Sequence, residues 1–214
     1  MKLYGVPHSP FVARVRLALR LKGLDFEELA PPGGSLKSAE YLALNPLGKV
    51  PLLVTGSGAK IAESEAIIDY LEEAFPEPSL IPGHADARIH MRYLIRLSEN
   101  YAIPAVMRLF GQMQPETRDA ATVDRELGKM AQALELLQDD IGLEDYAVGS
   151  AASKADCILL PTLMLCKLTG GIFGASGIVA EFPGLKRYAM KARENEIIKD
   201  VMTSAEVALS VLKF

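Results

Sequence analysis

The sequence lacks the features that mark several large classes of protein. Its formal net charge of −4 at pH 7 leaves no excess of Lys and Arg, so we expect neither a nucleic acid nor an anionic membrane surface as a partner. No run approaches the ~20 consecutive apolar residues of a membrane span, and the first residues carry Lys2 but no apolar stretch of the signal-peptide kind. Internal repeats and low-complexity tracts are also missing. These absences favour a cytoplasmic globular protein.

Cysteine and histidine, the residues behind most disulfide frameworks and metal centres, are scarce. Only Cys157 and Cys166 are present, and on one helix they would point about 180° away from each other at ~100° per residue. They cannot bridge within that helix, so reduced thiols in a cytosolic protein are the simplest interpretation. The histidines, His8, His84 and His90, do not show the spacing of metal ligands. We expect no bound metal.

What the sequence does contain is enough apolar material for a large core. Half of the 214 residues are hydrophobic and 23% are charged, which is typical of a globular chain with one large domain or two small ones. A proline-rich break, FPEPSLIPG over 75–83, separates a part with strand and turn signals from a part with helical periodicity. We therefore predict one domain over 1–76 and an all-helical domain over 86–214.

The C-terminal part shows the periodicity of amphipathic helices. We expect helices at the following places: 86–113 with a kink at Pro104, 127–141, from Ser153 to Gly170, and from near Pro183 and near Thr203. Ser153 with Asp156 three positions later is a capping-box variant, because the carboxylate can accept a bond from the Ser153 N–H. We interpret this pair as a folding element without a catalytic role.

The most informative stretch is NPLGKVPLLVTGSGAKIAESEAIIDYL, residues 45–71. It predicts a turn, a strand over 50–54, a hairpin turn, a second strand over 59–62, and a helix with Ser64 as its N-cap. Pro51 lies at the start of a strand, where a missing N–H is tolerated. If the Val50–Pro51 bond is cis, as about 5–6% of X–Pro bonds are, the Val50 N–H and C=O are exposed to an extended peptide lying alongside.

Glu63 and Ser64 lie where this helix begins. The helix N-terminus and the Ser64 hydroxyl can hold a carboxylate, while the Glu63 side chain can hold an ammonium group. A zwitterionic amino-acid group needs this pair of partners. The alternative is an ordinary N-cap with an acidic residue in the first turn.

The N-terminal segment predicts a β-α-β unit. Strands are expected over 2–6 and 26–30, with a helix between them that has Ser9 as its N-cap. This order favours a right-handed parallel crossover. The Ser9 hydroxyl either only caps the helix or also donates a hydrogen bond to a thiolate, which the positive helix end would favour as well. Arg14 and Arg16 are expected on a solvated or ion-paired helix face.

Together, NPLGKVP followed by ESEAI, and LYGVPHSPFVARVRLALRLKG before them, resemble the cytosolic glutathione S-transferases, in particular the serine-type phi and tau groups. The resemblance spans almost the whole chain. It implies an α/β thioredoxin-like N-terminal domain of βαβαββα order followed by an all-α C-terminal domain. It also implies that Ser9 contacts the glutathione thiol, that Val50 and Pro51 bind the cysteinyl backbone of glutathione, and that Glu63 and Ser64 bind its γ-glutamate.

The resemblance carries over to two lysines and leaves one rival to the serine. Lys37 and Lys49 fall where relatives place residues near the glycine end of glutathione, although both can be surface lysines, and Leu36 replaces a histidine often found there. Other classes use a tyrosine near the end of the first strand, which makes Tyr4 a rival to Ser9. Its position inside the predicted strand favours a role in the core or on the face of the sheet.

The function that the resemblance implies is a glutathione transferase for detoxification, with glutathione as co-substrate. A thiolate held by the serine would attack a small, electrophilic, mostly apolar substrate, and the protein would be a homodimer. Candidates for the hydrophobic co-substrate pocket are Phe11, Met107, Phe110 and Met113, although a Met and Phe stripe on a helix is more often core. Two alternatives remain: another glutathione-dependent enzyme (isomerase, dehalogenase or peroxidase), or a non-catalytic glutathione- or ligand-binding module.

Overall fold

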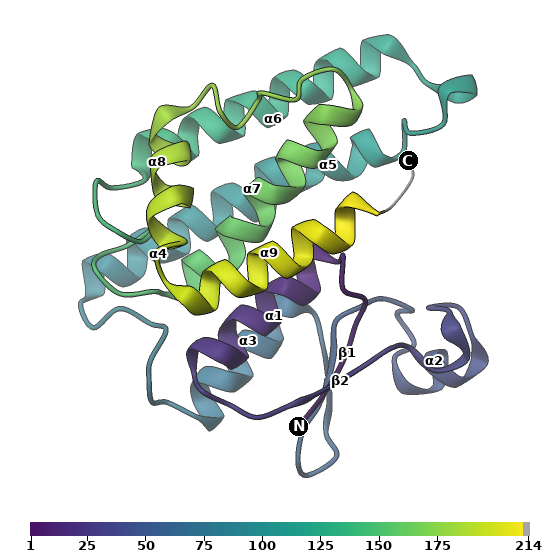
Figure 1. The fold of residues 1–214 in the computed structure, drawn as a ribbon, viewed down its shortest axis with the longest axis vertical. Helices are drawn as coiled ribbons and strands as arrows, with labels where there is room; N and C mark the ends of the chain where they lie inside the picture. Colours follow the sequence, from purple (N-terminus) through teal and green to yellow (C-terminus); the bar gives the residue numbers. More distant parts are fainter. Residues whose placement is uncertain (212–214) are drawn as a thin grey trace. The chain divides into compact units, whose positions relative to one another are not determined.

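The computed structural model describes residues 1–211 of the chain and divides them into two compact units. The first unit comprises 1–80 together with 197–211, and the second comprises 81–196. Residues 197–211 thus group with the first unit, whereas the sequence places them in the helical domain 86–214, of which 212–214 lie outside the described residues. Figure 1 shows the helices and strands of both units.

The first unit is built on a four-stranded sheet. Its elements in chain order are β1 (Lys2–Tyr4), α1 (Pro10–Leu21), β2 (Glu27–Leu29), the 3₁₀ turn η1 (Pro32–Gly34), α2 (Ala39–Leu44), β3 (Leu52–Val54), β4 (Lys60–Ala62) and α3 (Ser64–Ala74). This order confirms the expected βαβαββα arrangement. Each strand is shorter than its sequence pattern suggests, because the apolar runs extend beyond the paired residues.

The pairing register aligns one edge of this sheet. The strand order is β2-β1-β3-β4, with β1 parallel to β2, and β3 antiparallel to both β1 and β4. Tyr4 stands opposite Leu29 and Leu52, and Leu52 stands opposite Ala62. The last residues of β1, β2 and β4 and the first residue of β3 therefore lie along the same edge, and the segments that continue from them begin there.

Helix α1 begins where the sequence predicts. Ser9 has extended backbone angles, and its hydroxyl accepts a 3.3 Å hydrogen bond from the Val12 N–H, which confirms it as the N-cap. Helices α1 and α3 pack against each other, and both bury apolar side chains such as Leu19 and Ile67. Burying a side chain of this size stabilises the fold by about 1.5–3 kcal/mol. The packing fixes where the N-terminus of α1 lies relative to the sheet.

Arg14 and Arg16 are both buried, so the solvated alternative of the sequence prediction is wrong. The expected ion pairing is present for Arg16, whose guanidinium pairs with Glu28 and donates a 3.5 Å hydrogen bond to the Pro7 carbonyl oxygen. The Arg14 guanidinium carbon lies 4.7 Å from the centre of the Phe11 ring. Helical periodicity cannot show that a long side chain folds back over its neighbours instead of reaching solvent.

Two helices begin at other residues than the sequence suggests. Ser64 is not an N-cap: α3 begins with Ser64 itself, and the N-cap position belongs to Glu63. Helix α9 (Glu196–Ser210) starts well before Thr203. The buried side chains of Ile198 and Met202 already belong to its apolar face, so the helix is initiated ahead of the threonine.

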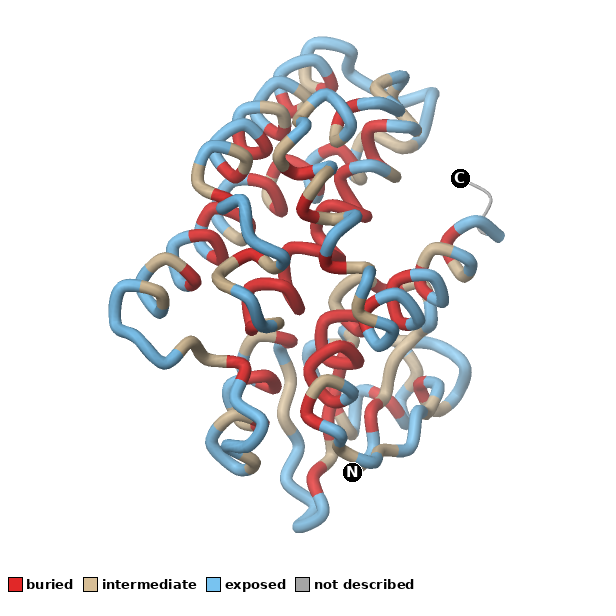
Figure 2. Tube along the Cα trace, turned by 60° about the vertical axis from the view of Figure 1, so that its left-hand side comes forward, coloured by how far each residue is buried: buried red, intermediate tan, exposed pale blue. Residues whose placement is uncertain are grey.

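The second unit is helical. Its elements are α4 (Ala85–Leu97), the π-helical turn η2 (Ser98–Ala102), α5 (Ile103–Phe110), the 3₁₀ turn η3 (Pro115–Thr117), α6 (Ala120–Asp140), α7 (Lys154–Ile172) and α8 (Pro183–Ala192). The helix expected over 86–113 is interrupted next to Pro104, as predicted, by the π-helical turn. Proline has no N–H for the carbonyl of Asn100 and its ring crowds that oxygen, so the chain widens there. Figure 2 shows buried residues along one side of most helices.

Helix α7 forms the core of the second unit. By length and composition it could cross a membrane, but 78% of its apolar window is buried inside the protein, as in the core helix of a globular fold. The Asp156 carboxylate accepts hydrogen bonds from the backbone N–H groups of Ser153 (2.7 Å) and Ala147 (2.8 Å), which confirms the capping box. It also accepts a 3.0 Å bond from the Tyr188 hydroxyl of α8. The Asp156 carboxylate therefore connects the start of α7, the backbone at Ala147 and helix α8.

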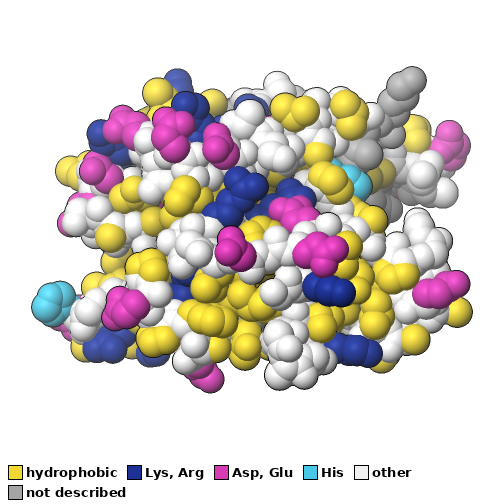
Figure 3. Space-filling view, turned by 60° about the horizontal axis from the view of Figure 1, so that its bottom comes forward, with side chains coloured by type: hydrophobic (Ala, Val, Ile, Leu, Met, Phe, Trp, Pro, Cys, Tyr) yellow, Lys and Arg dark blue, Asp and Glu magenta, His cyan; other side chains and the backbone are white. Residues whose placement is uncertain are grey.

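Charge on the protein surface is mixed. On the face drawn in Figure 3, Lys and Arg side chains lie among Asp and Glu side chains, and apolar side chains gather between them. Opposite charges at short range largely cancel at a distance in salt solution. The face shown therefore carries no broad region of a single sign.

Candidate functional site

Four chain segments meet at the aligned edge of the sheet. They are 5–9 after β1, 30–38 after β2, 45–51 before β3, and Glu63 after β4. The glutathione-binding residues predicted from the sequence all lie on these segments or at the first position of α3: Ser9, Lys37, Lys49, Val50, Pro51, Glu63 and Ser64. The topology thus brings the ends of these segments, which are far apart in the sequence, to one edge of the sheet.

Ser9 is able to fill both of the roles that the sequence left as alternatives. Its side-chain oxygen accepts the hydrogen bond from the Val12 N–H, and the proton of its own hydroxyl is not used in that bond. The residue is 8% exposed. The N-terminus of a helix stabilises a nearby negative charge by roughly 0.3–1 kcal/mol. Ser9 can therefore cap α1 and donate a hydrogen bond to an anion at the same time.

The loop before β3 is held by two side chains that the sequence analysis did not single out. The Tyr41 hydroxyl donates a 2.6 Å hydrogen bond to the Lys49 carbonyl oxygen, and the Asn45 side-chain amide donates a 2.8 Å bond to the same oxygen. The Asn45 side-chain oxygen accepts a 3.2 Å bond from the Leu47 N–H. The Val50–Pro51 peptide bond that follows is cis. These bonds define the backbone path of the loop.

The pKa of Tyr41 supports its role as a hydrogen-bond donor. Burial raises the pKa of its phenol, and the hydrogen bond with Asn45 opposes that shift only in part. The phenol is therefore protonated throughout the neutral range. The sequence offered one signal for this pair, an Asn at the end of a helix before Pro-Leu-Gly, but nothing in it shows that a tyrosine from the preceding helix reaches the loop.

Glu63 has the most unusual backbone conformation in the described chain. Its φ of 68° and ψ of 119° make it the one residue other than glycine with positive φ among residues 1–211. Side chains rarely adopt this region, and residues held there often serve a function. Glu63 is exposed, while Ser64 is 6% exposed at the first position of α3, where the backbone N–H groups have no partner within the helix. A carboxylate, a hydroxyl and the first backbone N–H groups of α3 thus adjoin one another in the chain.

The remaining predicted binding residues are less constrained. The side chains of Lys37 and Lys49 are exposed. Their backbones are held by hydrogen bonds: the Lys37 N–H donates to the Ser35 hydroxyl oxygen at 3.1 Å, and the Lys49 carbonyl oxygen accepts the two bonds described above. Tyr4 is the last residue of β1 and is half-buried. It therefore lies at the aligned edge and not inside the strand, as the sequence analysis assumed, and it remains a neighbour of the segment that leads to Ser9.

The predicted co-substrate residues come from both units. Phe11 belongs to α1 of the first unit, where its ring carries the Arg14 guanidinium. Met107 and Phe110 belong to α5, and Met113 follows that helix in the second unit. Met107 is exposed and the other two are half-buried, so none of the three is a core residue.

A mixed sheet of this order, with helices that begin at one edge and a cis-proline loop beside them, defines a thioredoxin-like domain, and a helical unit follows it. Residues 3–79 match the family model of the glutathione S-transferase N-terminal domain, and residues 99–195 match that of the C-terminal domain. Glutathione S-transferase 1 of Dianthus caryophyllus is 38% identical, over 87% of this chain and 84% of its own length. The chain belongs to the glutathione S-transferase family.

Other relatives carry a different name within this family. The maleylacetoacetate isomerase of Pseudomonas aeruginosa is 33% identical, over 79% of this chain and 83% of its own length. The crystal structure of the maleylacetoacetate isomerase of Methylobacterium extorquens, with bound malonate and glutathione, is 27% identical to this chain. It has a TM-score of 0.75 and covers 96% of this chain and 97% of its own. Both transferases and isomerases are therefore similar to this protein.

Proposed function

We propose that this protein is a serine-type glutathione transferase in which Ser9 holds the sulfur of glutathione as a thiolate. The observation that carries the proposal is the hydrogen bonding of Ser9. Its oxygen accepts from Val12 and caps α1, so its proton is available to a ligand at the aligned edge. A free thiol with pKa ~8.5 is mostly protonated at pH 7, and each unit by which the pKa falls corresponds to about 1.4 kcal/mol of stabilisation.

The other groups at this edge complement the rest of glutathione. The Val50 N–H and C=O pair with the cysteinyl backbone of the tripeptide. Glu63 accepts the ammonium of the γ-glutamate, while Ser64 and the N-terminus of α3 hold its carboxylate. Lys37 and Lys49 attract the glycine carboxylate from solvent-exposed positions. Charge is thereby matched at each end of the ligand.

In the transfer reaction, the thiolate attacks an electrophilic carbon of an apolar substrate. A sulfur–carbon bond forms, and the leaving group departs with the electrons of the bond that breaks. The proton of the glutathione thiol has already passed to solvent, so Ser9 keeps its own proton and acts only as a donor. Phe11, Met107, Phe110 and Met113 supply the apolar surface for the electrophile. Binding both reactants on one protein supplies the rest of the rate enhancement.

Isomerisation is the second candidate, because relatives named maleylacetoacetate isomerase are similar to this chain as well. The same thiolate would add to a carbon–carbon double bond conjugated with a carbonyl group. The bond between the two carbons then becomes single and rotates, and expulsion of the thiolate restores the double bond in the trans form. Glutathione is consumed in transfer and regenerated in isomerisation. Following free thiol during turnover of an aryl halide and of maleylacetoacetate therefore separates the two reactions.

The proposal is tested by the ultraviolet absorbance of bound glutathione as a function of pH. The wild type should show a thiolate band that titrates well below the pKa of the free thiol. In Ser9→Ala the pKa of bound glutathione should rise by about 1–2 units, the value of one charge-assisted hydrogen bond. Ser9→Thr is the matched control, because it keeps both the cap and the hydroxyl.

Each outcome of this titration has a distinct meaning. A thiolate band that is unchanged in Ser9→Ala would refute the role of Ser9 and leave the enzyme assignment intact. Tight binding of glutathione without any thiolate would support a non-catalytic binding module. Because Ser9→Ala also removes a helix cap worth about 1 kcal/mol, the titration is run at a temperature where both proteins are folded by circular dichroism.

We further propose that the protein is a cytoplasmic homodimer, as is typical of this family. Ile89 and Tyr93 support an interface on α4, because they lie one helical turn apart and both side chains are exposed. Light scattering at micromolar concentration should give twice the mass of one chain. A monomeric mass would contradict the proposed homodimer but would have no bearing on the proposed role of Ser9.

A further inference from the structure

One arginine holds together the two ends of the segment that connects α5 to α6, residues 111–119. Arg118 lies near the end of this segment, and its guanidinium reaches back to the beginning. The Nε–H donates a 3.0 Å hydrogen bond to the Gln112 carbonyl oxygen, and an N–H of Nη2 donates a 3.1 Å bond to the Met113 carbonyl oxygen. Because the guanidinium is a rigid, planar fork of donors, it can serve two consecutive carbonyl groups at once. The backbone of the segment is therefore fixed by a single side chain.

An aromatic ring lies against the same guanidinium. The guanidinium carbon of Arg118 is 4.9 Å from the centre of the Phe173 ring, a distance at which a cation and a ring attract each other. Phe173 is the C-cap of α7, and its N–H donates to the carbonyl oxygens of Thr169 at 3.3 Å and Gly170 at 3.2 Å. Arg118 thus links the segment between α5 and α6 to the end of a third helix.

Arg118 makes these contacts without an acidic partner. Among the described residues it forms no ion pair, and its hydrogen bonds go to uncharged carbonyl oxygens. The neighbouring carboxylate of Asp119 is used elsewhere, because it accepts a 3.2 Å bond from the Thr122 N–H and caps α6. The Arg118 side chain therefore orders the backbone of Gln112 and Met113 and does not serve to neutralise a charge.

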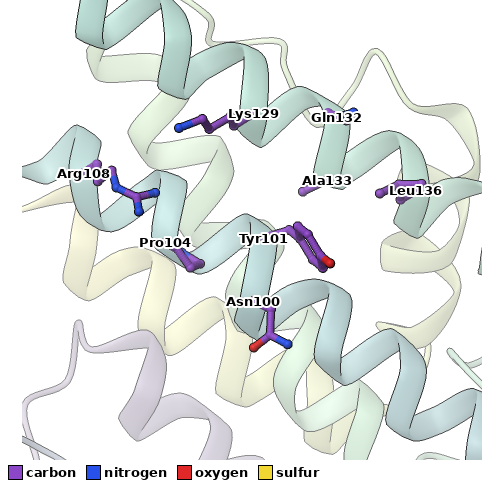
Figure 4. Close-up of a pocket in the computed structure, with 8 residues that line it drawn as sticks. All are labelled: Asn100, Tyr101, Pro104, Arg108, Lys129, Gln132, Ala133 and Leu136. Atoms are coloured by element: carbon purple, nitrogen blue, oxygen red, sulfur yellow. The ribbon is translucent and has the colours of Figure 1, made fainter.

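The helices on either side of the segment are fixed independently of Arg118. Figure 4 shows Arg108 on α5 and Lys129 on the neighbouring helix α6. Both donate to the buried carboxylate of Glu126, at 3.4 Å and 2.8 Å. The two helices also pack against each other. Replacing Arg118 should therefore release the connecting segment and leave α5 and α6 in place.

The backbone that Arg118 orders adjoins residues of the proposed co-substrate pocket. Phe110 is the last residue of α5, and its carbonyl oxygen accepts a 3.3 Å hydrogen bond from the Met113 N–H. Met113 is thus held through its N–H by Phe110 and through its carbonyl by Arg118. Both Phe110 and Met113 are half-buried, so each leaves apolar surface accessible. An apolar ligand binds more tightly when the side chains that it contacts are already ordered.

We propose that Arg118 is a positioning residue that holds Phe110 and Met113 in the arrangement that binds an elongated apolar group of the second substrate. The inference rests on the proposed function, which assigns these two residues to the co-substrate pocket. Arg118 acts through the backbone of Gln112 and Met113. It therefore determines the affinity for the apolar part of the second substrate and has no effect on the thiolate held by Ser9.

The test uses two ligands that differ only in the length of an alkyl chain, S-methylglutathione and S-hexylglutathione. Their dissociation constants for the full-length protein are measured by isothermal titration calorimetry. Each methylene group that leaves water tightens binding about two- to fourfold, so S-hexylglutathione should bind at least about thirtyfold more tightly than S-methylglutathione. In Arg118→Ala this ratio should fall at least about fivefold, because the released side chains must be ordered on binding, while the dissociation constant of glutathione itself should stay within about twofold.

Further variants separate the geometry of the side chain from its charge. Arg118→Lys keeps the positive charge but lacks the planar fork of donors, so it should lower the ratio nearly as much as Arg118→Ala. Phe173→Leu removes the aromatic face and should lower the ratio about two- to threefold. Arg125→Gln is the matched control, because it also removes an exposed arginine from this region, one that donates to Glu126 and Thr122 within α6. It should leave the ratio unchanged.

The outcomes distinguish this inference from the proposed function. An unchanged ratio in Arg118→Ala, or a wild-type ratio in Arg118→Lys, would overturn the inference and leave the proposed function intact. Equal weakening of glutathione and of both alkyl ligands in Arg118→Ala would show a general loss of structure and would also refute it. If the wild type bound both alkyl ligands equally well, the apolar co-substrate pocket itself would be contradicted, and the inference with it, whereas the thiolate titration would still test Ser9.

Discussion

The phenolic oxygen of Tyr41 lies 2.6 Å from the carbonyl oxygen of Lys49, so that a side chain of α2 fixes the backbone one residue before Val50. Asn45 reaches the same carbonyl at 2.8 Å. The two donors come from adjacent turns of one short helix and its C-cap. The backbone that we propose to bind the cysteinyl part of glutathione is therefore positioned by hydrogen bonds from Tyr41 and Asn45.

The first prediction removes the phenol. Tyr41→Phe should raise the dissociation constant of glutathione about three- to tenfold, because it removes one neutral hydrogen bond of about 1 ± 0.5 kcal/mol from the support of the loop. The pKa of the bound thiol should stay unchanged, since Ser9 is not affected. Isothermal titration calorimetry and the ultraviolet titration measure the two quantities separately.

Tyr188→Phe is the matched control for Tyr41→Phe. It removes another buried phenol, whose hydroxyl donates to Asp156 in the second unit. It should lower the free energy of unfolding by about 1–2 kcal/mol and leave the affinity for glutathione unchanged. If both variants weakened glutathione binding equally, loss of stability and not loop position would be the cause.

The second prediction concerns the positive φ of Glu63. Glu63→Gly should raise the free energy of unfolding by about 1 kcal/mol, because glycine adopts a φ of 68° without steric cost. The same change should weaken the binding of glutathione about tenfold, since it removes the proposed partner of its ammonium group. The stability measured by urea denaturation should therefore rise, while the affinity measured by calorimetry should fall.

Glu63→Ala separates the two effects of that change. It removes the carboxylate but keeps a side chain at the strained position, so affinity should fall as in the glycine variant while stability should not rise. A glycine variant that binds glutathione as tightly as the wild type would remove Glu63 from the site and leave its backbone conformation unexplained.

The sequence was sufficient to predict the fold. Ser9 was recognisable as an N-cap because a capping side chain followed by proline is a local signal, and the turn at Pro46–Gly48 has the same character. Local signals could not give what depends on pairing at a distance. The register of β1, β3 and β4, which brings the segments to one edge, became visible only in the structure.

The details that the sequence does not show depend on contacts between distant residues or on backbone angles. For Arg16 the sequence predicts a solvated or ion-paired face, and the structure shows the ion-paired alternative with Glu28, a partner on a strand that the helix position does not reveal. The prediction of Ser64 as the N-cap is wrong by one residue: the N-cap position belongs to Glu63, whose positive φ is unusual for any residue except glycine. Helix α9 likewise shows an ordinary amphipathic pattern that does not reveal which unit its buried side will join.

The third prediction tests a buried ion pair in the first unit. The ammonium of Lys22 is fully buried and lies 2.6 Å from the carboxylate of Glu72, whose side chain is 11% exposed, and it also donates a 2.7 Å bond to the Pro78 carbonyl oxygen. Lys22→Met should lower the free energy of unfolding by about 3 kcal/mol, because it leaves a largely buried carboxylate without its cation.

A double-mutant cycle with Glu72→Gln isolates the pair. The double variant should recover at least about 1 kcal/mol relative to the sum of the single variants, since the unpaired charge is then absent as well. Strictly additive losses in urea denaturation would show that the two charges do not interact despite their distance.

The fourth prediction concerns the two thiols and bears on the interpretation of the thiolate titration. Within the described residues neither Cys157 nor Cys166 forms a disulfide, both are buried, and burial raises the pKa of Cys166 to about 12. At pH 8 only about one part in ten thousand of a thiol with this pKa is ionised. Native protein should therefore react with Ellman's reagent only as fast as it unfolds, whereas both thiols should react at once in denaturant. A fast phase in the native protein would contradict the burial of the two thiols. In that case a thiolate band at neutral pH could be assigned to bound glutathione only after the reactive cysteine had been replaced by alanine.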